Sequence, residues 1–145
     1  MIYYVVIDTN VLVSAMLKKN TPPDAIIRQV FKGNIIPLLN EEILDEYREV
    51  LGRTKFKFPE SAVKDIITGI TKDAVFMDAA PTEQILPDSK DIVFYEVVME
   101  GKKSKDAYLV TGNLKHFPKS PYIVDPREML EIMKQSKIEE DDKIM

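Results

Sequence analysis

The sequence contains no cysteine, no tryptophan and a single histidine, His116, among its 145 residues. The absence of cysteine excludes disulfide bonds and thiolate metal sites. Any bound metal ion would therefore be held by oxygen ligands or by His116. This is the kind of ligand set that hard divalent cations prefer.

Long hydrophobic runs are also missing. No apolar stretch approaches the roughly 20 residues of a membrane-spanning helix, and no basic segment followed by an apolar run opens the chain. We therefore expect a soluble, cytoplasmic protein with no membrane partner. The chain is of single-domain length and should bury roughly 68 to 70% of its unfolded surface in one core.

Charge is nearly balanced, with a formal net charge of −4. The last ten residues hold four acids, Glu139 to Asp142, against two lysines. We expect residues 1–135 to form one domain and residues 136–145 to form a flexible acidic tail. Nucleic-acid-binding domains are usually basic, so the overall charge gives no support for such a partner. Three local lysine-rich clusters remain as candidate contacts or as ordinary solvated surface: Lys18–Lys19, Arg53–Lys55–Lys57 and Lys102–Lys103–Lys105.

Strand-like and helical patterns alternate along the chain. This alternation predicts an α/β fold with a mostly parallel sheet that is covered on both faces. Residues 88–99 are ambiguous, because their β-branched side chains favour a strand while their length, their opening Asp88 and the following Gly101 favour a helix; we predict a helix. The strands are predicted at 3–7, 35–39, 74–77, 108–111 and 122–124, and the other helices at 11–17, 22–31, 41–51, 59–70 and 126–133.

Asp8 directly follows the first predicted strand. In parallel α/β sheets the functional crevice lies beyond the carboxyl ends of the strands, so this carboxylate faces a candidate site. Glu46 lies about 100° from the middle of the apolar stripe of helix 41–51, which directs it along the sheet edge more than any other acid of that helix. The alternative is that Glu46 is a boundary residue that pairs with a neighbour such as Arg53.

Two further segments, which carry three candidate residues, approach the same edge. Asp88 and Asp91 bracket the start of a helix, where they would either cap it or direct a carboxylate toward Asp8. Asn113 follows the strand at 108–111 and is either a ligand or a turn residue. Asp106 precedes that strand and is predicted to lie at the opposite edge.

Several carboxylates in one crevice repel one another unless a cation compensates for their charge. Mg²⁺ accepts a few carboxylates together with water molecules, and it activates water for attack on a phosphodiester. The acids therefore predict a metal-dependent phosphodiesterase.

The order and spacing of these segments resemble the PIN domain over roughly residues 2–133. The resemblance is closest to a subfamily described as toxins of toxin–antitoxin systems (VapC-like). It is carried by four segments: Val-Ile-Asp8-Thr9-Asn10-Val-Leu, the helix Glu-Glu-Ile-Leu-Asp-Glu46-Tyr-Arg-Glu-Val-Leu, the helix start at Asp91, and Leu-Val-Thr111-Gly112-Asn113 with His116-Phe117 following.

The resemblance implies a three-layer α/β/α sandwich and a ribonuclease that uses Mg²⁺ or Mn²⁺, and we expect it to be an endonuclease. It assigns catalytic roles to Asp8, Glu46 and Asp91, with Asp8, Asp91 and Asn113 holding the metal. Many PIN domains have Asp at the position of Asn113, which favours one metal over two, and either Asp88 or Asp91 could supply the third acid. Thr9, Asn10, Asp88 and Thr111 are the supporting residues.

The resemblance also implies an RNA substrate, a homodimer and a neutralising antitoxin protein. The alternative is a non-catalytic RNA-binding or scaffold module on the same fold. A phosphoacceptor receiver domain is disfavoured, because Thr9 rather than an acid follows Asp8. We predict that His116 is a structural residue beside Phe117, and that Phe56 and Phe58 hold a loop on the core rather than stack on RNA bases.

Overall fold

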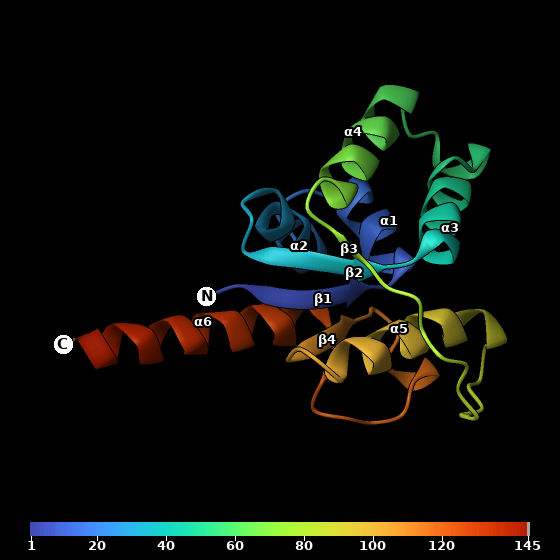
Figure 1. Ribbon diagram of the computed structural model, residues 1–145. Coiled ribbons are helices and arrows are strands. Elements are labelled where there is room, and N and C mark those ends of the chain that lie inside the picture. The colour runs from blue at the N-terminus through green and yellow to red at the C-terminus, as the bar shows by residue number, and fades with distance from the viewer. Residues whose placement is uncertain (145) are drawn as a thin grey trace.

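The computed structural model describes residues 1–144, with side chains described through residue 142. Five parallel strands form one sheet in the order β3-β2-β1-β4-β5. Helices α1 to α4 lie on one side of the sheet and α5 lies on the other, so the fold is the predicted α/β/α sandwich (Figure 1). The strands are β1 (Tyr3–Ile7), β2 (Ile35–Leu39), β3 (Val75–Phe76), β4 (Ala107–Val110) and β5 (Ile123–Val124).

Six α-helices and three short 3₁₀ helices connect and cover these strands. The hydrogen bond from the Ile43 amide to the Asn40 side chain, at 2.9 Å, caps α3 as predicted. Gly33 adopts φ +84° after α2, in the left-handed region where glycine is favoured. The α-helices are α1 (Thr9–Leu17), α2 (Pro22–Phe31), α3 (Glu41–Leu51), α4 (Glu60–Thr71), α5 (Ile92–Lys102) and α6 (Pro126–Ile144), and the 3₁₀ helices are η1 (Thr54–Phe56), η2 (Ser89–Asp91) and η3 (Leu114–His116).

The central strand β1 positions the site. It pairs with β2 on one side and with β4 on the other, and Ile7 lies opposite Val110 in the β1–β4 register. Val5, Val6 and Ile7 have no exposed surface. The residues that follow Ile7 and Val110 therefore emerge side by side from the middle of the sheet.

The ambiguous segment at 88–99 is helical, as η2 followed by α5, because its apolar side chains pack on β1, β2 and β4. Several predicted bounds differ by one residue, and two helix bounds differ by more. Helix α1 begins at Thr9, directly after the extended Asp8, and not at residue 11. Helix α6 continues past residue 133 to Ile144, so the described part of the predicted acidic tail is helical. Lysine, glutamate and glutamine favour helix, and no glycine or proline interrupts this segment.

The short segment around η1 agrees with the structural interpretation of its aromatic residues. The rings of Phe56 and Phe58 stack on each other, with centroids 5.4 Å apart, and Phe58 packs against the core. Among the described residues, no helix is long and apolar enough to cross a membrane.

Candidate active site

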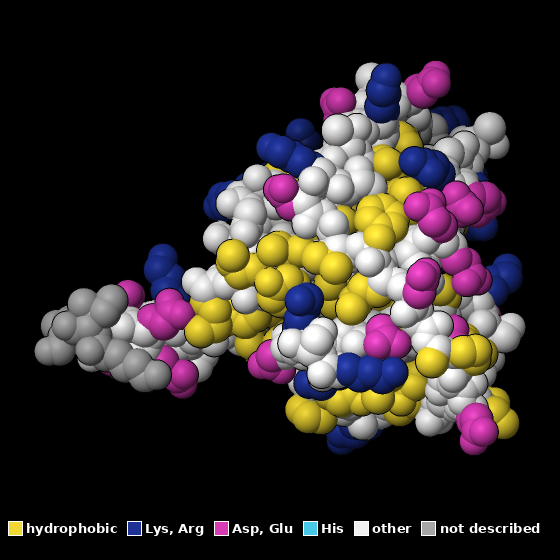
Figure 2. All heavy atoms as spheres, in the orientation of Figure 1, with side chains coloured by type: hydrophobic (Ala, Val, Ile, Leu, Met, Phe, Trp, Pro, Cys, Tyr) yellow, Lys and Arg dark blue, Asp and Glu magenta, His cyan; other side chains and the backbone are white. Residues whose placement is uncertain are grey.

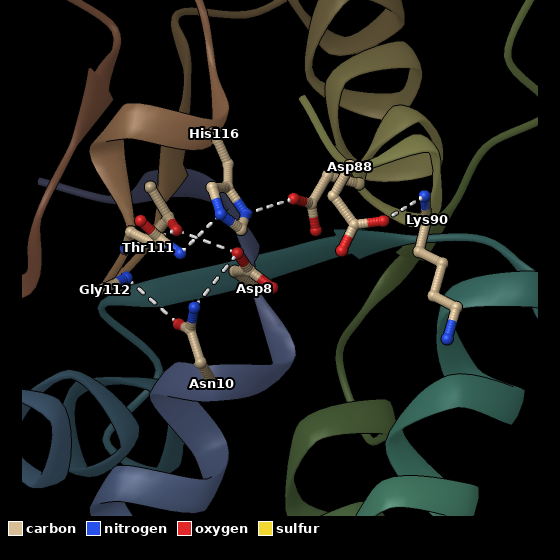
Figure 3. Close-up of polar contacts among 9 residues, drawn as sticks. Asp8, Asn10, Asp88, Lys90, Thr111, Gly112 and His116 are labelled. Carbon is tan, nitrogen blue, oxygen red and sulfur yellow. Dashed lines mark hydrogen bonds and ion pairs between the residues drawn. The ribbon is translucent and has the colours of Figure 1, made fainter. Parts of the chain in front are cut away.

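Asp8 and Thr111 meet where β1 and β4 end. The amide of Asp8 donates to the carbonyl of Val110 at 2.9 Å, which extends the strand pairing by one residue. The Thr111 hydroxyl donates to Oδ2 of Asp8 at 2.8 Å (Figure 3). Asp8 is 5% exposed and Thr111 is fully buried, so a rigid and largely dry hydrogen bond fixes this carboxylate.

Asn10 connects the first turn of α1 to the loop after β4. Its Nδ2 lies 3.4 Å from Oδ2 of Asp8, and its Oδ1 accepts a hydrogen bond from the Gly112 amide at 3.0 Å (Figure 3). A β-carbon at Gly112 would lie 3.2 Å from Oδ1 of Asn10. The close approach of these two segments therefore favours glycine at this position.

Helix α3 brings Glu46 to the same edge. The Thr9 hydroxyl donates to Oε2 of Glu46, and the buried Tyr47 hydroxyl donates to the carbonyl of Ile7. Glu46 and Tyr47 of α3 are therefore hydrogen-bonded to Thr9 and Ile7, the two residues that flank Asp8. Arg53 pairs with Glu49 at 2.9 Å and not with Glu46, so the surface pairing considered for Glu46 is absent.

The third acid, Asp91, ends the 3₁₀ helix that precedes α5. Its Oδ2 lies 2.8 Å from Nδ1 of His116, whose Nε2 lies 2.9 Å from Nδ2 of Asn113. Both contacts are satisfied when Nδ1 donates a hydrogen bond to Asp91 and Nε2 accepts one from the Asn113 side-chain amide. The loop after β4 thus orients the Asp91 carboxylate.

Asp88 lies at the edge of this group. Ligand atoms of Asp88, Asp91 and His116 all fall within 4.8 Å of one another. Asp88 also accepts a hydrogen bond from the backbone amide of Lys90 at 3.0 Å, and so it acts as the predicted cap (Figure 3). These three side chains could hold a metal ion together.

The negative charges of the neighbouring carboxylates raise one another's pKa values. Burial, together with the charges of Asp91 and Glu46, raises the pKa of Asp8 to about 6, although the Thr111 hydrogen bond opposes the shift. Burial and the charge of Asp91 also raise the pKa of Glu46. Burial and the charge of Asp88 raise the pKa of Asp91. Lys90 lowers the pKa of Glu46 and His116 lowers that of Asp91, but by less than burial raises them, and a bound cation would further favour the charged forms.

The charges of Asp91 and Glu46 act on Asp8, so these three acids lie near one another, but the side chains close enough to share one ion are those of Asp88, Asp91 and His116. Asp106 is exposed, pairs with Lys102 and lies before β4, as predicted. The sequence predicts a structural role for His116, yet its ring contacts two of the candidate residues, Asp91 and Asn113. Its spacing of three residues from Asn113, across a single 3₁₀ turn, was the signal that could have indicated this.

A parallel α/β/α sandwich with acids gathered beyond the carboxyl ends of its central strands defines the class of open α/β proteins whose functional site lies at that edge of the sheet. Within that class the chain belongs to the PIN domain family, whose model matches residues 4–115. It is also 28% identical to an uncharacterized protein of Methanocaldococcus jannaschii over 118 residues, which cover 75% of this chain and 70% of that protein. No solved structure matches the chain.

Proposed function

We propose that this protein is a metal-dependent endoribonuclease that hydrolyses RNA phosphodiester bonds. PIN domains belong to a nuclease superfamily, and membership of the family makes a nuclease the starting hypothesis. The observation that carries the proposal is the burial of the Asp8 carboxylate at the end of β1, where the charges of Glu46 and Asp91 also act on it and help to raise its pKa to about 6. Such a group is stable in its charged form when a cation is bound.

The donor set fits Mg²⁺ or Mn²⁺. Asp8 and Asp91 would hold the ion, with the amide oxygen of Asn113 as a further ligand, and Asp88 and His116 lie close enough to Asp91 to contribute. A bound divalent ion would acidify water and stabilise negative charge on the phosphate. A single metal suits this set, because Asn113 supplies no charge for a second one.

Each side chain has a task in this proposal. Thr111 and Asn10 fix the Asp8 carboxylate, and His116 fixes that of Asp91. Glu46, held by Thr9 and raised in pKa, is suited to accept the proton of the attacking water at Oε1 or Oε2.

The proposal is tested by cleavage of RNA in Mg²⁺, Mn²⁺ or EDTA, with wild-type protein and Asp8→Asn purified in parallel. Cleavage that requires metal and disappears in the variant supports it. A circular RNA substrate distinguishes the two modes of attack, because only an endonuclease opens it. Cleavage by both proteins at equal rates would identify a contaminant and contradict the proposal.

We further propose that the enzyme acts in the cytoplasm as the homodimeric toxin of a toxin–antitoxin pair. This rests on the resemblance of the motifs around Asp8, Glu46 and Asn113 to that PIN subfamily. Expression of the wild-type chain should then arrest growth, while Asp8→Asn should not, and co-expression of the product of an adjacent gene should restore growth. Normal growth with active protein would exclude the toxin role.

A second candidate is a non-catalytic RNA-binding module on the same fold. The observation in its favour is that Asn113 stands where many PIN domains have an acid. In addition, the side-chain nitrogen of Asn113 contacts the ring of His116. Metal-independent RNA binding, without cleavage of any tested RNA, would favour this alternative.

A further inference from the structure

His116 lies beside two of the candidate carboxylates. A ring nitrogen of His116 and one oxygen each of Asp88 and Asp91 all lie within 4.8 Å of one another. Figure 3 shows His116 reaching from the loop after β4 toward Asp88, which precedes α5. Ligands on opposite sides of an octahedral ion lie about 4.2 Å apart, because each bond is about 2.1 Å long. The three side chains therefore enclose a space of the size of one divalent ion.

The contact between Asp91 and His116 has the spacing of two neighbouring ligands. Oδ2 of Asp91 lies 2.8 Å from Nδ1 of His116. Adjacent ligands of an octahedral ion with bonds of about 2.1 Å lie about 3.0 Å apart. The side chain of His116 is 36% exposed and that of Asp91 is 14% exposed, so this pair is open to solvent. An ion could therefore bind both atoms with only a small movement of either side chain.

Both carboxylates are free of basic partners. Within the part of the chain that the structure describes, neither Asp88 nor Asp91 forms an ion pair with a lysine or an arginine. Oδ1 of Asp88 accepts the hydrogen bond of the Lys90 amide at 3.0 Å, which leaves its other oxygen for a further ligand. Two adjacent carboxylates of this kind favour a cation between them.

The surface around the site is acidic as well. Figure 2 shows Asp and Glu side chains gathered over α3, the helix that carries Glu46. Acidic surroundings raise the local concentration of cations. The exposed acids of α3 are Glu41, Glu42, Asp45 and Glu49.

Asn113 allows His116 to become a ligand without losing its second contact. In the metal-free protein Nδ1 donates to Asp91, and Nε2 accepts a hydrogen bond from the Asn113 side chain. A ligand nitrogen must carry a lone pair, so an ion at Nδ1 requires the ring proton to move to Nε2. Rotation of the Asn113 amide then turns its oxygen toward that proton, since an amide can either donate or accept. Metal-bound histidines usually donate their second ring N–H in this way.

We propose that His116 is a direct ligand of the divalent ion through Nδ1, together with Asp88 and Asp91, and that this nitrogen selects Mn²⁺ over Mg²⁺. Mg²⁺ prefers oxygen ligands, whereas imidazole suits transition-metal ions. Asn113 then orients the imidazole and is not itself a ligand, which changes the ligand set that the family resemblance implies. The inference rests on the proposed function only in that both require a divalent ion at Asp91.

The first test is pulsed electron paramagnetic resonance of the full chain with substoichiometric Mn²⁺ and without RNA. Mn²⁺ is paramagnetic, so a nitrogen nucleus bound directly to it modulates its spin echo. We expect this nitrogen modulation in the wild type and none in His116→Gln, which keeps a polar side chain but lacks the ring. Lys115→Gln, at the exposed neighbouring position, should retain the modulation.

The second test is calorimetric titration with Mn²⁺ and with Mg²⁺. The wild type should bind Mn²⁺ at least about tenfold more tightly than Mg²⁺, and His116→Gln should reduce this ratio to about threefold or less. Asp88→Asn should weaken the binding of both ions and keep the nitrogen modulation, because it removes a charge and not the imidazole. Tm in EDTA shows that each variant is folded.

The outcomes separate this inference from the proposed function. Mn²⁺ that binds the wild type without nitrogen modulation would overturn the inference and leave a metal-dependent nuclease intact, with His116 only orienting Asp91. Equal selectivity in the wild type and in His116→Gln would overturn it as well. Nitrogen modulation without cleavage of any RNA would support the inference and contradict the proposed function. If neither ion bound at about 10 mM, where even weak sites fill, both would fail.

Discussion

Thr111 donates its hydroxyl hydrogen bond to Asp8 across the ends of two adjacent strands, at 2.8 Å, although 103 positions separate the two residues in the sequence. The Thr111 hydroxyl oxygen also accepts a hydrogen bond from the backbone amide of Asn113 at 3.0 Å. One buried hydroxyl therefore orders both an acid and the loop that carries Asn113 and His116.

Thr111→Val should keep the shape of the core and remove this hydroxyl. Asp8 would lose a hydrogen bond that favours its charged form, so its pKa should rise above about 6. We expect RNA cleavage at neutral pH to fall by about tenfold or more and the pH optimum to move upward. The measurement is a rate–pH profile. Thr71→Val on α4 is the control, since its hydroxyl bonds only to carbonyls of its own helix, and an unchanged profile for Thr111→Val would contradict the role of the hydroxyl.

Asp8→Asn should stabilise the metal-free protein at neutral pH. The folded-state pKa of Asp8 is about 6 and its unfolded value is near 4, so the folded state binds more protons in between. The contribution of Asp8 to the free energy of unfolding therefore falls as pH rises from about 4 to about 7, by about 2 to 3 kcal/mol. We expect Asp8→Asn to raise Tm at pH 7.5 and to change it little at pH 4.

Metal addition should reverse this difference. Mg²⁺ or Mn²⁺ that binds only the folded state raises Tm with concentration, and Asp8→Asn should lose most of that rise. Thermal unfolding in EDTA and in 10-fold steps of metal concentration measures both effects. An equal rise in both proteins would show that Asp8 is not a metal ligand.

Asp91 and Asp88 should differ in their effect on activity. Asp91 is oriented by His116, whereas Asp88 holds the Lys90 amide as a cap. Asp91→Asn should abolish cleavage, while Asp88→Asn keeps a capping oxygen and should reduce it by less than about tenfold. Initial rates on one RNA, with Tm as a folding control, compare the two. The reverse order would assign the third acid to Asp88.

His116→Ala should weaken metal binding without unfolding the protein. His116 is partly exposed, and its contacts join Asp91 to Asn113 rather than fill the core. Residues that orient metal ligands typically change metal affinity by about 10- to 100-fold. A Mn²⁺ titration followed by calorimetry measures this, with Lys115→Ala as the neighbouring control. Unchanged affinity would leave His116 as the structural residue that the sequence suggested.

The sequence was sufficient for the fold because burial imposes a visible pattern. Strands such as β1 and β2 are short apolar runs bounded by polar residues, and α3 has a single apolar stripe with a capping Asn40. The end of α6 was missed because a charged helix with little buried surface carries no such pattern.

The site was only partly predictable. The positions of Asp8, Glu46 and Asp91 follow from strand ends and helix faces, which are local features. The hydrogen bonds of Thr111 and His116 depend on the β1–β4 register and on the loop that follows it, which no local pattern encodes. Such contacts require the three-dimensional structure.

The hydrogen bond from the Tyr47 hydroxyl to the carbonyl of Ile7 limits how far the site around Asp8 can open. Ile7, Asp8 and Thr111 sit in the paired, buried centre of the sheet, so their amide protons are shielded until the whole domain unfolds. In hydrogen-exchange measurements Asp8 would thus belong to the slowest class of residues. The site around Asp8 would then keep one shape, and any adjustment on binding would fall to the ligand.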